Sequence, residues 1–167
     1  MPANTRAKVA ILDDYQGIAL HMADWSAVQK RAELTVFRDH LFDTDALVAR
    51  LQPFDAICVM RERTPLTRTL LERLLNLRLI SSTAPRNASI DVAAAKERGV
   101  TVCGTGYVSH GAAELTWALI LALVRRVPAE AASVRQGGWQ VSLGDDLEGK
   151  TLGILGLGRL GGRKWVS

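Results

Sequence analysis

Five short apolar runs alternate with stretches of helical periodicity over the first hundred residues of the chain. The apolar runs span residues 8–12, 34–37, 55–60, 77–80 and 100–103. The stretches with helical spacing span residues 18–31, 43–51, 66–75 and 91–98. Short apolar strands separated by helices are typical of a parallel sheet that is covered on both faces. The pattern therefore predicts an α/β domain over about residues 6–104.

Residues at the ends of the expected helices support this layout. Asp43 or Thr44 can cap the second helix, and Thr67 or Pro65 stands near the start of the third. Gly99 provides a left-handed end for the fourth helix. Because crossovers between parallel strands are right-handed, we predict a flavodoxin-like, doubly wound sheet.

The alternation of short apolar runs and helical stretches ends after residue 104. Ser109 can cap a long helix over about residues 110–126, and Pro128 begins another helix that ends at residues 137–138. A turn at residues 145–149 then leads into a further apolar run at 150–155, which we expect to be a strand. We therefore divide the chain into a domain of residues 1–105 and a second segment of residues 106–167.

The last apolar run leads directly into Gly156-Leu-Gly158-Arg-Leu-Gly161. A strand that enters G-x-G-x-x-G is typical of a dinucleotide-binding turn. The first glycine permits the turn, the second lets the backbone approach a pyrophosphate, and the third lets the next helix pack on the strand. That helix would supply N–H groups to the anion. Because only six residues follow Gly161, we expect weak or no cofactor binding by this chain.

Composition narrows the possible partners. The net charge of +4 comes from 21 basic and 17 acidic residues that are scattered along the chain, so we expect no nucleic-acid binding. The longest apolar stretch, residues 112–124, is interrupted by Glu114 and is too short to cross a membrane. Cys58 and Cys103 lie in apolar runs and are expected to be reduced core thiols in the cytoplasm. His21 and His40 are expected at the surface or the edge of the core, and no metal site is predicted.

Five stretches, taken in order, resemble the D-isomer-specific 2-hydroxyacid dehydrogenase family, which includes phosphoglycerate dehydrogenase-like proteins. They are residues 61–66, 77–80, 89–100, 113–123 and 149–161. The resemblance implies that the first domain binds substrate and that the second segment is the opening part of a Rossmann cofactor domain. It also implies an NAD(P)-dependent oxidoreductase that acts on the CH–OH group of a small 2-hydroxy acid, with NAD favoured, and a homodimer at full family length.

The resemblance assigns site residues by position. Arg61 follows the third apolar run, and Arg86 and Asn87 lie in the loop after the fourth, where relatives carry a glycine turn that holds the substrate carboxylate. Cofactor contacts are implied for Gly156, Gly158, Arg159, Leu160, Gly161 and His110. The family's catalytic arginine, acidic residue and histidine lie well downstream of the glycine loop, so we expect them beyond Ser167. The chain is thus interpreted as C-terminally truncated, and we expect no turnover from it.

Two alternative hypotheses assign the same fold to a protein that is not an enzyme. Asp13 and Asp14 after the first apolar run suit a signalling receiver, a flavodoxin-like module that binds a metal there. A receiver also needs an aspartate ending the third strand and a lysine after the fifth, where this chain has Met60–Arg61 and Cys103–Gly104. A non-enzymatic NAD-sensing protein is the remaining alternative.

Overall fold

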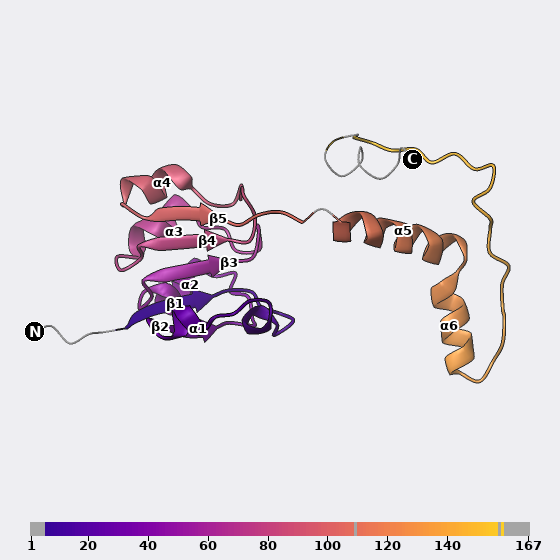
Figure 1. The fold of residues 1–167 in the computed structure, drawn as a ribbon, viewed down its shortest axis with the longest axis horizontal. Helices are drawn as coiled ribbons and strands as arrows, with labels where there is room; N and C mark the ends of the chain where they lie inside the picture. The colour runs from indigo at the N-terminus through magenta and orange to yellow at the C-terminus, as the bar shows by residue number, and fades with distance from the viewer. Residues whose placement is uncertain (1–5, 109, 157, 159–167) are drawn as a thin grey trace, which may run out of the picture. The chain divides into compact units, whose positions relative to one another are not determined.

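A computed structural model describes residues 6–108, 110–156 and 158. The chain forms two units, Met1–Tyr107 and Val108–Ser167, and each is described by itself. The first unit contains a five-stranded sheet of β1 (Ala7–Ile11), β2 (Ala32–Val36), β3 (Ala56–Val59), β4 (Leu79–Ser82) and β5 (Thr101–Gly104). All strands are parallel and their order is β2-β1-β3-β4-β5 (Figure 1). This order is that of a flavodoxin-like sheet, so the predicted α/β class is confirmed.

The core lies against one face of this sheet. Three helices cover that face: α2 (Thr44–Leu51), α3 (Arg68–Arg73) and α4 (Val92–Glu97). Every second strand residue points toward them, among others Ala10, Ile57 and Ile80, and all three are fully buried. The helix residues that pack on these strands are Leu47, Val48, Leu51, Leu70, Leu71, Ala94 and Ala95.

Each of the three core helices begins at a capping side chain. Asp43, Thr67 and Asp91 accept a hydrogen bond from the backbone N–H three residues later. The structure thus selects Asp43 and Thr67 from the alternatives that the sequence left open. Gly99 has a φ of +70° just after α4, as the predicted left-handed end requires.

The prediction of one helix over residues 18–31 is wrong. The structure has a 3-10 turn, η1 (Ala19–His21), and one short helix, α1 (Ser26–Gln29), neither of which has a buried residue. Asp24 interrupts the segment because its carboxylate accepts from the Ser26 N–H, which removes that donor from a continuous helix.

Two details of the strands also differ from prediction. β4 begins two residues later than expected, because Leu77 lies in a buried turn and donates its N–H to the Leu74 carbonyl. Cys103 is not a core thiol: it lies exposed on β5, an edge strand. Cys58 is half-buried on β3, and both cysteines are free.

The second unit contains two helices, α5 (His110–Val124) and α6 (Val127–Arg135). They contact each other, and Arg126 between them has a left-handed backbone with φ of +53°. The predicted strand at 150–155 is absent from the described residues: this segment pairs with no strand, and an unpaired strand is not stable by itself. The Ser109 cap falls outside the described residues. None of the helices described has the length and apolar character needed to span a bilayer.

Candidate functional site

The candidate site lies at the carboxyl edge of the first unit's sheet. β1 and β3 are neighbours, and the connections that follow them run in opposite directions along the sheet, from β1 to β2 and from β3 to β4. In open α/β sheets, ligands bind at such a point, outside the carboxyl ends of the strands. Asp13, Arg61 and Thr83 each follow closely after one of the strands β1, β3 and β4.

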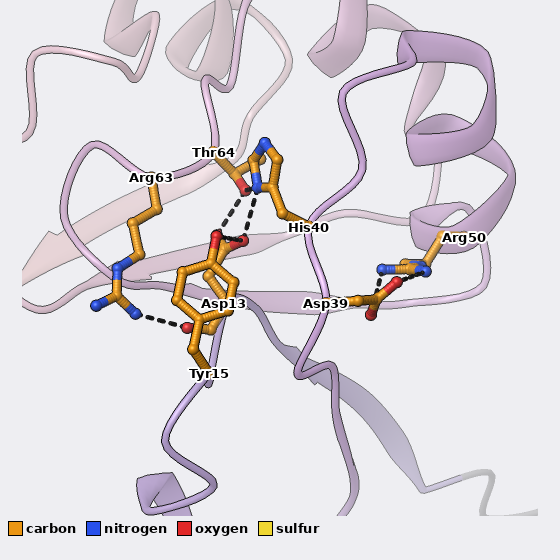
Figure 2. Close-up of polar contacts among 7 residues, drawn as sticks. All are labelled: Asp13, Tyr15, Asp39, His40, Arg50, Arg63 and Thr64. Carbon is orange, nitrogen blue, oxygen red and sulfur yellow. Dashed lines mark hydrogen bonds and ion pairs between the residues drawn. The ribbon is translucent and has the colours of Figure 1, made fainter.

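Asp13 is the centre of a polar cluster at this edge (Figure 2). Its carboxylate accepts from the Thr64 hydroxyl at 2.6 Å and lies 2.8 Å from Nδ1 of His40. The Tyr15 hydroxyl lies 3.4 Å from the same carboxylate, and an Arg63 guanidinium N–H donates to the Asp13 backbone carbonyl at 2.6 Å. His40 follows β2 and Thr64 follows β3, so the cluster joins the loops of three adjacent strands.

The environment of Asp13 favours a structural role for its carboxylate. The side chain is 2% exposed, and both of its oxygens contact protein groups. The backbone is left-handed, with φ of +58°, a conformation that aspartate tolerates better than most residues. A buried carboxylate is stable where it is paired and hydrogen-bonded. Asp13 therefore ties the loops after β2 and β3 to the end of β1.

Asp14 is also used within the protein. Its two carboxylate oxygens accept from the N–H groups of Ile18 and Ala19 at 3.0 and 3.1 Å. Burial alone would raise the pKa of Asp14, but these N–H groups and the nearby charge of Arg38 outweigh it and lower the pKa. In the part of the chain that the structure describes, no three His, Cys, Asp or Glu side chains are grouped to hold a metal. The aspartates thus do not form the metal site of a receiver in this structure.

A pocket of about 270 Å³ lies beside the Asp13 cluster. It is lined by His40, Leu41, Phe42, Thr44, Leu47, Pro65, Thr67 and Leu70. The lining is mostly apolar and contains no arginine or lysine. An acidic ligand would find its cationic partners instead along the loops after β3 and β4.

Arg61 differs from the other predicted substrate residues in its backbone conformation. Its φ of +52° is left-handed, and its side chain is 51% exposed. The guanidinium lies 5.8 Å from the centre of the Tyr107 ring and 3.7 Å from the Glu62 carboxylate. A backbone in this region costs energy in a residue with a side chain, and such residues concentrate at functional sites. The guanidinium itself is accessible to a ligand.

Arg86 and Asn87 lie in the loop after β4, as predicted from the sequence. Arg86 is exposed, whereas Asn87 is partly buried and hydrogen-bonded within the loop. Gly104 fixes the position of this loop: a Cβ there would lie 2.3 Å from the Ala84 carbonyl oxygen. Sequence reasoning missed Gly104, although a glycine at the end of a strand is a signal for close backbone approach.

The predicted cofactor residues lie in the second unit. Gly156 has a φ of +88°, which suits the first glycine of a dinucleotide turn, and Gly158 and His110 are exposed. Arg159, Leu160 and Gly161 lie outside the described residues. A cradle for pyrophosphate also needs a paired strand before the turn, and residues 150–155 form none in the described part of the chain. The described residues therefore do not fit a bound dinucleotide.

The fold is a doubly wound α/β domain, and its candidate ligand site lies at the carboxyl ends of the strands. A sequence profile described as "D-isomer specific 2-hydroxyacid dehydrogenase, catalytic domain" matches residues 9–152. The chain belongs to the D-isomer specific 2-hydroxyacid dehydrogenase family. This confirms the family resemblance stated from the sequence.

Relatives and solved structures agree with this assignment. The chain is 34% identical to human D-3-phosphoglycerate dehydrogenase over 131 residues, covering 77% of this chain and 24% of that protein. It is 34% identical to Thermotoga maritima hydroxypyruvate reductase over 137 residues, covering 80% of this chain and 44% of that one. The crystal structure of a phosphoglycerate oxidoreductase from Vibrio cholerae superposes with a TM-score of 0.85 at 42% identity, covering 94% and 51%. The chain thus spans about half or less of the length of these proteins.

Sequence reasoning did not predict the polar cluster around Asp13. His40 was expected at the surface or core edge, yet it lies against a buried carboxylate 27 residues away in sequence. The signal that could have found it is the polar residue after each of three neighbouring strands, which parallel pairing brings to one edge.

Proposed function

We propose that this chain contains the substrate-binding unit, and the opening part of the cofactor-binding unit, of an NAD(P)-dependent 2-hydroxyacid dehydrogenase. In this proposal Arg61 binds the carboxylate of a small 2-hydroxy or 2-oxo acid. The observation that carries it is the accessible guanidinium of Arg61 at the strand ends, on a backbone held in a left-handed conformation. The planar guanidinium can donate two parallel hydrogen bonds to a carboxylate.

The names of relatives support this substrate class. They include D-3-phosphoglycerate dehydrogenase, hydroxypyruvate reductase and glyoxylate reductase, the last from Aeropyrum pernix. Their named substrates share a carboxylate and a short carbon chain. Arg86 is exposed on the neighbouring loop and provides a second cation for such an acid.

The reaction proposed for a protein of the relatives' full length is reversible hydride transfer between the acid and a nicotinamide, with NAD favoured over NADP. Such a protein is proposed to be a cytoplasmic homodimer. For residues 1–167 by themselves we propose binding of the acid without turnover, because the described residues 150–156 and 158 do not form a cofactor cradle.

Acid binding can be tested by titrating the chain with hydroxypyruvate and following its amide signals by NMR. Dihydroxyacetone, which has CH₂OH in place of the carboxylate, is the matched neutral ligand. Loss of a charge-assisted hydrogen-bonded contact costs about 1.5–3 kcal/mol. Arg61→Ala is therefore expected to weaken hydroxypyruvate binding roughly 10- to 100-fold.

Arg78→Ala is the control, because Arg78 is an exposed arginine at the amino end of β4. Equal affinity for hydroxypyruvate and dihydroxyacetone, or an Arg61→Ala variant that binds as tightly as the wild type, would refute the proposal. An assay of NADH and NADPH oxidation at 340 nm with hydroxypyruvate checks the absence of turnover.

A further inference from the structure

The backbone of Arg61 is held by side chains of the adjacent loop. Its N–H donates to the Thr83 hydroxyl oxygen at 3.2 Å, and its carbonyl accepts from the Asn87 side-chain amide. Thr83 and Asn87 both lie in the loop after β4, the strand that pairs with β3. The two polar groups of the Arg61 main chain are therefore both bound from the same loop.

This arrangement matters because of the conformation that it holds. Arg61 is one of three non-glycine residues with positive φ in the described part of the chain. A left-handed backbone is unfavourable for a residue with a Cβ. Relaxation of Arg61 to an ordinary conformation would point its side chain in a different direction. Two hydrogen bonds to fixed partners offset that cost and set the direction of the guanidinium.

Asn87 is itself fixed by further hydrogen bonds. Its amide nitrogen also donates to the Ser82 hydroxyl at 3.2 Å. Its carbonyl oxygen accepts from the N–H of Ser89 at 2.9 Å and from the Ser89 hydroxyl at 2.7 Å. Both polar atoms of the Asn87 side chain are thus bound to protein groups, which argues against a direct contact with an acidic ligand.

We propose that Asn87 and Thr83 are positioning residues for the acid: they hold Arg61 in its left-handed conformation and so direct its guanidinium toward the carboxylate. This inference rests on the proposed function of Arg61. It assigns Asn87 a different role from the substrate contact that its sequence position implies.

The conformational part can be tested without any ligand. The ¹³Cα and ¹³Cβ chemical shifts of Arg61 report whether its backbone is left-handed. Asn87→Ala and Thr83→Val each remove one of the two hydrogen bonds, and valine keeps the shape of threonine. We expect both variants to move the ¹³Cα and ¹³Cβ shifts of Arg61 toward the values of a backbone with negative φ.

Asn76→Ala is the matched control. The Asn76 side-chain amide also donates to a backbone carbonyl, that of Gln52 at 3.0 Å, but it precedes β4 at the other edge of the sheet. This variant should leave the Arg61 shifts unchanged. Unchanged Arg61 shifts in both Asn87→Ala and Thr83→Val, with folding verified by far-UV circular dichroism, would overturn the inference.

The functional part requires a double-mutant cycle with hydroxypyruvate as the probe. Loss of one hydrogen bond is expected to weaken binding about 2- to 10-fold in Asn87→Ala and in Thr83→Val. In the Arg61→Ala background the same changes should have no further effect, because they act through Arg61. A direct contact between Asn87 and the acid, or a general loss of structure, would give the same fold-change in both backgrounds and would overturn the inference.

The two proposals fail differently in these experiments. Absence of hydroxypyruvate binding by the wild-type chain would refute the proposed function. The carbon shifts of Arg61 would still decide whether Thr83 and Asn87 hold its backbone.

Discussion

Replacement of Asp13 by asparagine tests the central cluster of the site. Asparagine tolerates a left-handed backbone about as well as aspartate, so the φ of +58° can be kept. The variant loses the charge and one acceptor oxygen. Because His40 and Thr64 contact different oxygens of the Asp13 carboxylate, one of the two will face an N–H₂ group instead.

The expected cost follows from those two contacts. A hydrogen bond to a charged group contributes about 1.5–3 kcal/mol. One of the two contacts is kept in Asp13→Asn, and the side chain of His40 is not fully buried. We therefore expect the free energy of unfolding of the first unit to fall by about 1.5–3 kcal/mol.

Urea unfolding should be followed through NMR amide signals of β1 and β3, so that only the first unit is measured. Asp39→Asn is the matched control, because Asp39 forms an exposed ion pair with Arg50 near the same loop (Figure 2). Its effect should be much smaller. If Asp13→Asn costs no more than Asp39→Asn, or if His40→Ala costs as much in the Asp13→Asn background as in the wild type, the coupling inferred here is wrong.

Two further predictions concern thiol reactivity and pH. Iodoacetamide should alkylate Cys103 before Cys58, because Cys103 is exposed while burial, with a smaller effect of Cys103, raises the pKa of Cys58 to about 11. Peptide mass spectrometry over time checks the order, and faster modification of Cys58 contradicts it. The pKa of Asp14 is lower in the folded protein than its ordinary value of 3.8, so the ionised carboxylate stabilises the fold at pH values above 3.8. This contribution is lost as the pH falls through the lower pKa of the folded state. The difference in stability between the wild type and Asp14→Asn should therefore be largest near neutral pH and should shrink below pH 3.8. Urea unfolding midpoints at several pH values measure it, and a difference that does not change with pH would contradict this prediction.

Local signals sufficed for most of the first unit. Asp43 and Thr67 cap helices where the sequence placed them, because an N-cap depends on residues only three positions apart. The apolar runs predicted the strands because burial on a parallel sheet requires them. The helix predicted over residues 18–31 was wrong because the apolar spacing there resembles that of a helix. The Asp24 side chain competes for a backbone N–H in this segment, which the spacing does not reveal.

Long-range contacts could not be read in this way. His40 meets Asp13 because β2 pairs beside β1, a fact of strand order and not of local spacing. Arg61 was placed at the site by its position after a strand, but nothing in the sequence announced its left-handed backbone. Residues 150–155 have the composition of a strand, yet a strand also needs a neighbour to pair with.

The parallel order of the sheet has a consequence for synthesis of the chain. Each strand pairs with one that is separated from it by a whole crossover, so no two neighbouring strands can form an early hairpin, and such topologies nucleate slowly. All of this pairing nevertheless ends at Gly104. A nascent chain therefore holds every partner its sheet requires once that residue has left the ribosome, before α5 emerges.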